Sequence, residues 1–403
     1  MGRLAQRNMQ QDRQRRKKEK EAEGKTGSKK NQRRWSQLNP DFSFKPHYNR
    51  VDGLHLGVSA SRPLAKRLSL QANNGYSLAL ERWSRGLGAN LDWGKTQQGW
   101  AQVEYRAGTR SRYDSATHSL LLNSAQTLLG FNDYFDYYWN EQVRAQVGYR
   151  FKQPQARLVF AVQSEEHTSL AKSTNLELVS RHQLLRPNPK IEVGTLRSAR
   201  LAVQLGNNYV PFGITRNKRL ALEAEYSDDW MESDFSFGRY ALVIDWQVQT
   251  FLRRRLMPNA LDLRLIGGFS SGNLPIQRFA IVDASTGPFT PFGTLRTLRG
   301  IPYEGQHYAA AFWEHNFKSA PFELLGLWGL ARRGFGLVLH GAVGRTWIDS
   351  DRRATLGYTP HFIAGFHHEV GLSLQLYHLL RLDLTRRLDR GGWHFGVGMA
   401  RFG

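Results

Sequence analysis

The sequence predicts an all-β protein: a transmembrane antiparallel β-barrel of about sixteen strands that follows a basic N-terminal tail. Three observations predict this class. Segments of alternating apolar and polar residues recur along the chain, their polar positions carry Arg, Glu, Asp and Gln, and turn residues separate them. Strands of such a barrel place apolar side chains against lipid and polar side chains in a wet lumen. We expect one closed barrel over residues 48–403.

The composition agrees with strands rather than helices in a membrane. Hydrophobic residues make up 40% of the 403 residues, and mean hydropathy is -0.52. No run of about 18 apolar residues, the length of a transmembrane helix, is present. Cysteine is absent, which excludes disulfides and thiolate metal sites. The net charge of +22 indicates an anionic partner, such as lipid headgroups, lipopolysaccharide or nucleic acid.

Residues 1–36 form a strongly polar, basic segment, which we interpret as a disordered tail or the remnant of a linker. An arm that binds nucleic acid or anionic lipid is the alternative interpretation. The start has positive charge but no apolar signal region. We therefore expect that the N-terminus is truncated and that a signal peptide lies upstream of Met1.

Period-two alternation is clear at Val143, Ala145 and Val147, whose polar neighbours are Arg144 and Gln146. The same reasoning predicts sixteen strands, near 53–61, 67–77, 83–94, 98–108, 142–151, 155–164, 197–206, 218–227, 237–250, 260–269, 276–283, 305–317, 335–347, 367–377, 379–388 and 391–402.

Two insertions, 109–141 and 165–196, interrupt this series of strands. The first predicts a short amphipathic helix and an aromatic cluster, either beside the membrane or as a plug. The number of strands predicted before it places this insertion on the periplasmic side, where turns are usually short. One misassigned strand would move it to the opposite side.

The segment 287–316 carries the most informative motif. A loop rich in Gly, Pro and Thr reaches Leu298-Arg299-Gly300, and Glu314 follows on the next predicted strand. The strand after it carries Gly344 and Trp347. An arginine fork can hold a carboxylate with two hydrogen bonds, and an adjacent glycine allows a sharp turn. The alternative is an ordinary loop arginine and an ordinary lumen carboxylate.

In this order the motif resembles the bacterial surface antigen, or outer-membrane assembly-factor, superfamily. The resemblance implies a sixteen-stranded barrel whose sixth extracellular loop folds into the lumen and docks its Arg on acidic residues of the next two strands. Here Ile301 replaces the usual aromatic residue and Ala342 replaces the second acid. The resemblance therefore implies one pair, Arg299–Glu314. Other stretches resemble a branch seen mainly in Bacteroidetes-type bacteria.

The resemblance implies a non-enzymatic protein of the cell outer membrane that inserts, translocates or delivers proteins or lipids. Client proteins or lipids, and the barrel-assembly machinery during biogenesis, would be its partners; we expect no cofactor, no metal and no nucleic acid. A lateral seam would open between the first and last strands and pair with a client strand. The residues that we place at this seam are Gly53, Leu54, Leu56, Trp393, Phe395 and Phe402.

Two alternatives remain open. One is a passive outer-membrane pore whose Arg-rich lumen prefers anions. The other, from a different class, is a soluble basic β-protein that binds nucleic acid through its N-terminal arm.

Overall fold

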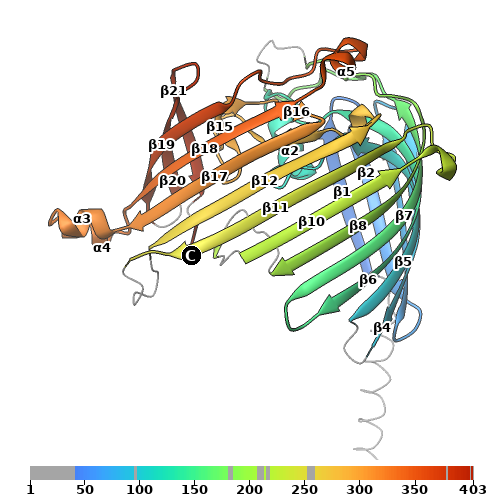
Figure 1. The fold of residues 1–403 in the computed structure, drawn as a ribbon, viewed down its shortest axis with the longest axis horizontal. Coiled ribbons are helices and arrows are strands. Elements are labelled where there is room, and N and C mark those ends of the chain that lie inside the picture. Colours follow the sequence, from blue (N-terminus) through green and yellow to red (C-terminus); the bar gives the residue numbers. More distant parts are fainter. Residues whose placement is uncertain are drawn as a thin grey trace, which may run out of the picture.

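The computed structural model describes residues 41–94, 98–179, 185–206, 213–214, 218–251, 259–377, 380–399 and 401–402; the predicted tail, 1–36, lies outside them. Sixteen strands form one antiparallel sheet (Figure 1). They are β1 (Asp41–Asn49), β2 (Gly53–Pro63), β3 (Leu68–Ser77), β4 (Arg82–Trp93), β5 (Gly99–Ser111), β6 (Tyr137–Phe151), β7 (Ala156–Ser169), β8 (Gly194–Gly206), β10 (Lys218–Ser227), β11 (Phe237–Gln249), β12 (Ala260–Gly272), β17 (His307–Lys318), β18 (Gly336–Trp347), β19 (His367–Leu376), β20 (Leu380–Arg387) and β21 (Trp393–Met399).

The sheet is polar inside and apolar outside. Large apolar side chains such as Leu87 and Val103 are exposed on its outer face, by 65% and 56%. Charged side chains such as Glu225 and Asp245 are buried on its concave face. A soluble protein would arrange these residues the other way round, whereas lipid outside and water inside fit this arrangement. The predicted class, a membrane-type antiparallel barrel, is confirmed, and the soluble alternative is disfavoured.

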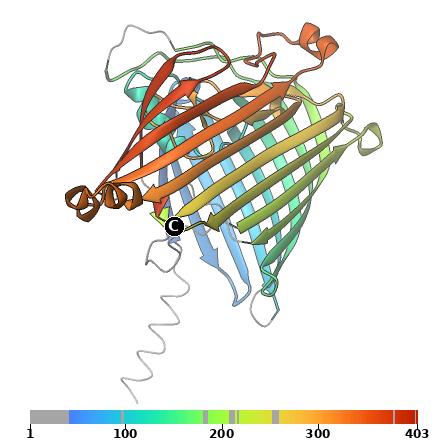
Figure 2. The same ribbon diagram turned by 60° about the vertical axis from the view of Figure 1, so that its left-hand side comes forward.

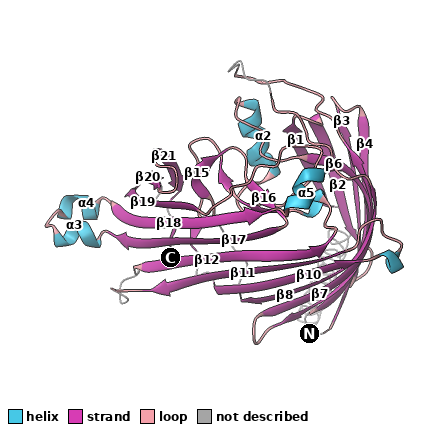
Figure 3. Ribbon diagram, turned by 45° about the horizontal axis from the view of Figure 1, so that its top comes forward, coloured by secondary structure: helices cyan, strands magenta, loops and turns pink. Residues whose placement is uncertain are grey.

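Closure of the barrel is the part of the expectation that the structure does not bear out. The sheet begins at β1 and ends at β21, and within the described residues no pairing register joins these two strands. Figure 3 shows β1 and β21 apart, with β15 between them. We call this opening between β1 and β21 the seam.

The count of sixteen is correct, but two of the assignments behind it are wrong. The first strand is β1, Asp41–Asn49, which the sequence analysis missed. The predicted strand 276–283 is not part of the sheet; it forms η2 (Ile276–Arg278) and β13 (Ala280–Val282) inside the lumen. Because the missed strand precedes the insertion 109–141, the insertion lies at the opposite end of the barrel from the one that parity predicted.

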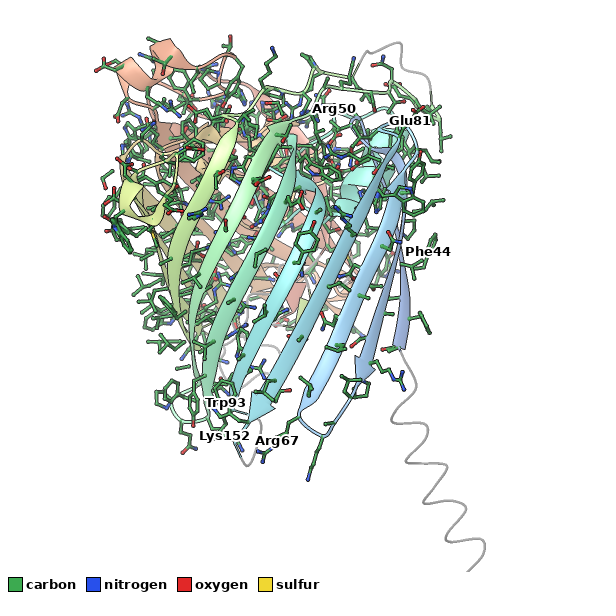
Figure 4. All side chains as sticks on the ribbon, turned by 90° about the vertical axis from the view of Figure 1, so that its right-hand side faces the viewer. Phe44, Arg50, Arg67, Glu81, Trp93 and Lys152 are labelled. Carbon is green, nitrogen blue, oxygen red and sulfur yellow. The ribbon has the colours of Figure 1, made fainter. Side chains whose placement is uncertain are left out.

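The two ends of the barrel differ in the length of their connections. At one end, the long-loop rim, lie residues 112–136, 170–179, 185–193, 273–306 and 348–366. At the other, the short-turn rim, β2–β3 and β6–β7 are joined by residues 64–67 and 152–155. Figure 4 shows Arg50 and Glu81 at the long-loop rim, and Arg67, Trp93 and Lys152 at the short-turn rim.

The helices lie in these connections. They are α2 (Leu120–Leu128), which confirms the helix predicted in 109–141, α3 (Ala320–Leu324), α4 (Trp328–Arg332), α5 (Ser350–Thr355) and the 3-10 turn η1 (Asp229–Met231). In the part of the chain that the structure describes, none of them has the length and apolar character needed to cross a membrane.

Candidate functional site

Residues 273–306 connect β12 to β17 and fold back into the lumen; we call them the inserted loop. Besides η2 and β13 it contains β14 (Ala284–Ser285), β15 (Leu295–Arg299) and β16 (Tyr303–Gly305). β13 pairs with β16 and β14 pairs with β15, so the loop satisfies much of its own backbone. Figure 3 shows β15 and β16 within the curve of the sheet. The loop is therefore an ordered body held against the inner wall.

Four alternating charges hold the loop to the wall. The guanidinium of Arg296 on β15 donates to Oε1 of Glu314 on β17, and Nη1 of Arg381 on β20 lies 3.0 Å from the same oxygen. Nε of Arg381 lies 2.8 Å from Oδ1 of Asp383, and Nε of Arg296 lies 3.9 Å from Oδ2 of Asp383. All four side chains are buried. Two positive and two negative charges compensate one another, as burial requires. We call this group the arginine lock.

A third carboxylate, Glu369 on β19, holds the backbone of the same strand. Its Oε1 accepts from the N–H of Arg296 at 2.7 Å, and its Oε2 accepts from the N–H of Thr297 at 2.9 Å. The Thr297 hydroxyl donates to Oε2 at 2.8 Å and lies 2.7 Å from Nε2 of His367. Hydrogen bonds to an ionised acceptor are stronger than neutral ones. The wall therefore fixes both the side chain and the backbone of β15.

The predicted pair Arg299–Glu314 is wrong. Arg299 is exposed, and its Nη2 donates at 2.6 Å to the backbone oxygen of Phe395 on β21. Glu314 instead forms an ion pair with Arg296, which lies three residues before Arg299. In an extended segment, residues an odd number apart face opposite sides. The side of β15 that carries Arg296 meets the wall, so Arg299 points toward the last strand.

The other predicted lock residues lie where the loop needs space or a turn. Gly300 has φ +84°, a backbone conformation that suits glycine. A Cβ at Gly344 on β18 would come within 3.1 Å of Cγ1 of Val282 in the loop. Trp347, at the end of β18, is half-buried and has the Arg345 guanidinium 4.9 Å from its ring. Gly300 and Gly344 thus permit the docking, whereas Trp347 contacts Arg345 of its own strand and Phe366, which precedes β19.

Sequence reasoning missed Arg296, Arg381, Glu369 and Asp383. The segment "TLRTLRG" offers two arginines, and the Arg-Gly dipeptide drew attention to the second. The sequence signal for the acids was present: Glu369 and Asp383 both occupy polar positions of alternating strands. These two carboxylates, which lie on strands further along the wall, take the place of the acidic residue that is absent at Ala342.

The strand on the N-terminal side of the seam is not the predicted one. Gly53, Leu54 and Leu56 lie on β2, one strand inside the edge, because β1 precedes them. Gly53 turns the chain with φ +63°, while Leu54 and Leu56 point outward. The edge strand β1 contains Pro46, which cannot donate to a neighbouring strand and so suits an edge.

At the other side of the seam the prediction placed the correct strand. Trp393 and Phe395 lie on β21 and are exposed by 62% and 56%. Phe402 belongs to β22 (Arg401–Phe402), which pairs in parallel with β9 (Gly213–Ile214) rather than extending β21.

The inserted loop occupies the edge of β21. Phe289 forms a parallel bridge with Val397. The N–H of Thr290 donates to the oxygen of Val397 at 3.0 Å, and the N–H of Val397 donates to the oxygen of Pro288 at 2.6 Å. The Thr290 hydroxyl also donates to Asp383 of the arginine lock. The backbone groups that would pair with another strand are thus used here by residues 288–290.

The edge of β1 is covered near the long-loop rim by the connection 112–136. The N–H of Tyr48 donates to Oγ of Ser124 on α2 at 2.8 Å. The same connection holds the inserted loop: the Tyr134 hydroxyl donates to Asp283 at 2.7 Å, and Nε2 of Gln126 donates to Thr286 at 2.6 Å. Two connections therefore bridge the seam where the two edge strands do not pair.

A buried charge cluster supports this bridge. Arg50, in the turn after β1, lies 2.6 Å from Asp136 and 3.3 Å from Asp133. Arg186 lies 2.5 Å and Arg112 3.8 Å from Asp136. Burial raises the pKa of Asp136, but the guanidinium groups of Arg186, Arg112 and Arg50 outweigh it and hold that pKa below its usual value. The turn after β1 is thus tied to 112–136 by charges.

Three comparisons place this geometry among known proteins. The C-terminal domain of a family of unknown function, DUF5686, matches residues 22–212. No curated protein matches the sequence significantly. Among solved structures, BamA from Haemophilus ducreyi lacking POTRA domains 1-3 is 10% identical with a TM-score of 0.51, over 89% of this chain and 69% of that one.

Two further structures are more distant. CdiB from Escherichia coli is 11% identical with a TM-score of 0.43, over 89% of this chain and 61% of that one. CdiB from Acinetobacter baumannii is 11% identical with a TM-score of 0.41, over 90% and 65%. The chain thus spans under two thirds of both. The similarity to BamA, at low identity, establishes fold alone: the chain has a barrel fold similar to that of BamA.

Proposed function

We propose that the protein is an outer-membrane barrel that inserts, translocates or delivers proteins or lipids, and that its seam is the working part. The observation that carries this proposal is the edge of β21, which bonds to residues 288–290 of its own inserted loop instead of to β1. A strand edge presents unpaired N–H and C=O groups that template another strand. A client strand would displace residues 288–290 and pair there by β-augmentation.

The arginine lock sets how readily this edge is released. Thr290 bonds both to Val397 on β21 and to Asp383 in the lock, so the segment that covers the edge is tied to the wall. Arg299 adds a bond to Phe395 on the same strand. The loop would move from the edge while its Arg296 end stays docked, because the two anchors lie at opposite ends of the segment 288–296.

A reversible crosslink tests the proposal. The chain has no native cysteine, so Phe289→Cys with Val397→Cys introduces one pair, which oxidation would use to fix the loop on β21. The matched control is Leu222→Cys with Leu242→Cys, which face each other on β10 and β11. The readout is the rate at which an unfolded outer-membrane barrel protein folds into vesicles that contain this protein, followed by heat-modifiable gel mobility.

We expect acceleration by the reduced protein, loss of acceleration on oxidation of the 289–397 pair, and recovery on reduction. Oxidation of the control pair leaves the rate unchanged. Equal rates with the 289–397 pair oxidised and reduced would count against a working edge at β21. Absence of acceleration by any form would count against client insertion as the function.

A passive, anion-preferring pore is the second candidate, and one observation favours it. Beside the inserted loop lies a cavity of about 390 Å³ whose lining includes seven arginines: Arg110, Arg112, Arg200, Arg219, Arg239, Arg264 and Arg278. Carboxylates such as Glu223 pair with several of them, which reduces the preference for anions. Planar-bilayer recording of a salt-gradient reversal potential tests this candidate; a steady conductance with anion preference would support it.

A further inference from the structure

Among the described residues of the short-turn rim, helices occur only in the connection between β17 and β18. Residues 319–335 form α3, a turn at Gly326 and α4, which we call the helical hairpin. Figures 1 and 2 show it beyond the ends of β17 and β18, directed away from the sheet. A Cβ added at Gly326 or Gly329 would meet nothing within 4 Å. The hairpin therefore extends into open space, where no other described element covers it.

The hairpin is ordered although it stands alone. The N–H of Leu325 donates to the oxygen of Pro321 at 3.2 Å, and the N–H of Leu327 donates to the oxygen of Phe322 at 2.8 Å. Gly326 and Gly334, with φ +74° and +78°, close its two turns. The backbone satisfies itself, as an apolar surrounding requires.

The side chains at its tip are apolar and exposed. Leu324 is exposed by 88%, Leu325 by 73% and Trp328 by 53%, and Leu327 is also exposed. Contact of such an apolar surface with water is unfavourable. A turn that only joined two strands would not need exposed apolar side chains. Two exposed arginines, Arg332 and Arg333, end α4 beside this surface. Leu and Trp beside Arg is the composition of a segment that lies in a membrane interface.

Aromatic side chains at the base of the hairpin indicate its depth relative to the membrane. The ring centroids of His315 and Phe317, near the end of β17, lie 4.2 Å apart, and those of Phe251 and Phe317 lie 5.7 Å apart. Phe335, before β18, lies 5.5 Å from Tyr377, which follows β19. Aromatic girdles mark the lipid headgroup level of membrane barrels. The hairpin thus starts at the level where hydrocarbon gives way to headgroups.

We propose that the helical hairpin inserts its tip, Leu324 to Trp328, into the interface of the lipid leaflet at the short-turn rim, with Arg332 and Arg333 bound to lipid phosphates. This inference rests on the proposed membrane insertion of the barrel. It adds a lateral anchor on β17, the strand that carries Glu314 of the arginine lock, and on its neighbour β18. The anchor would hold this part of the wall still relative to the bilayer while the seam moves.

Depth-dependent quenching tests the proposal on the whole chain in vesicles of stated composition. A polarity-sensitive fluorophore is attached to a single cysteine, and lipids that carry nitroxides either near the headgroup or along the acyl chain quench it according to its depth. The test position is Leu324→Cys. Lys152→Cys, on another exposed turn of the same rim, is the control for water, and Leu222→Cys, on the outer face of β10, is the control for barrel insertion.

We expect the label at Leu324 to show a blue-shifted emission and strong quenching by headgroup-level nitroxides, and the label at Lys152 to show neither. In the double variant Arg332→Gln with Arg333→Gln, quenching at Leu324 should lose its dependence on anionic phosphatidylglycerol. Quenching at Leu222 together with an unquenched, water-like Leu324 would overturn the anchor alone. Loss of quenching at Leu222 would instead contradict barrel insertion. A Leu324 label that is shielded only in native membranes would point to a protein partner and overturn the lipid assignment.

Discussion

At the scale of single residues, Arg296 and Arg299 form a natural pair of test and control. Arg296→Gln leaves Glu314 and Asp383 buried with Arg381 as the remaining guanidinium of the lock. Breaking a buried ion pair on one side typically costs roughly 3–5 kcal/mol, so we expect a clear loss of barrel stability. Arg299→Gln removes one exposed hydrogen bond to Phe395 and should change stability little. The urea midpoint of heat-modifiable gel mobility measures both; a larger loss for Arg299→Gln would restore the Arg-Gly motif as the lock.

A second residue-scale prediction concerns acid. Asp136 has a folded pKa below its unfolded value, which is about 3.9. Its contribution to stability is therefore fully present above the unfolded pKa and is lost as pH falls through the folded pKa. Asp136→Asn should be less stable than the parent at neutral pH, because Arg50, Arg112 and Arg186 lose a compensating charge.

The difference between Asp136→Asn and the parent should shrink as the pH of the urea titration falls below about 4. Asp351→Asn, exposed on α5, provides the control and should match the parent at each pH. A difference between Asp136→Asn and the parent that stays constant down to the lowest pH would show that charge is not what Asp136 contributes.

At the scale of elements, the sequence predicts strands better than their partners. Fifteen of the sixteen expected ranges overlap strands of the sheet, because a lipid-facing side leaves a period-two trace. β1 was missed because Pro46 interrupts a short alternation. Residues 276–283 were mistaken for a wall strand, because the apolar residues that this segment buries in the lumen resemble those of a strand; in the structure nearly all of its residues are buried. Arg296 could not be chosen over Arg299 without knowing which face of β15 meets the wall.

The contact between β18 and the inserted loop gives an element-scale prediction. A leucine at Gly344 would collide with Val282 and with Ala310, whose Cβ would lie 3.2 Å from the new Cβ. Overpacking of this kind costs about 1–3 kcal/mol, which the loop can relieve by leaving the wall. Gly344→Leu should therefore make residues 273–306 sensitive to protease while the sheet stays heat-modifiable. Gly357→Leu, where an added Cβ meets nothing within 4 Å, is the control. Protection equal to the parent would show that the loop does not need this surface.

At the scale of the whole molecule, the two rims predict its orientation in the membrane. Barrels of the bacterial outer membrane have short periplasmic turns and longer extracellular loops, so the long-loop rim should face outward. A membrane-impermeant maleimide should label Asp351→Cys, at the long-loop rim, on intact cells. Lys152→Cys, at the short-turn rim, should react after lysis alone (Figure 4). The reverse pattern would invert the orientation and would assign the helical hairpin to the outer leaflet.

The bridge across the seam predicts how the open sheet is held together. β1 and β21 are joined through residues 112–136 and the inserted loop, and Tyr134 links the two: its hydroxyl donates to Asp283 and accepts from the N–H of Ala284 at 3.1 Å. Tyr134→Phe removes the hydroxyl partner of these two buried groups, which should cost about 1–3 kcal/mol of stability. Because the sheet strands far from the seam pair on both sides, the loss should stay local.

Hydrogen exchange measures this locality. In Tyr134→Phe, amides of β1 and of residues 288–290 should exchange faster than in the parent, while those of β10 to β12 keep their rates. Tyr226→Phe, whose exposed hydroxyl donates to Asp228 at the same rim, is the matched control and should leave the seam unchanged. Faster exchange across all strands would mean that Tyr134 stabilises the barrel as a unit. Unchanged exchange at β1 would mean that the seam is held elsewhere, with the arginine lock and the β21 edge as the remaining links between the loop and the wall.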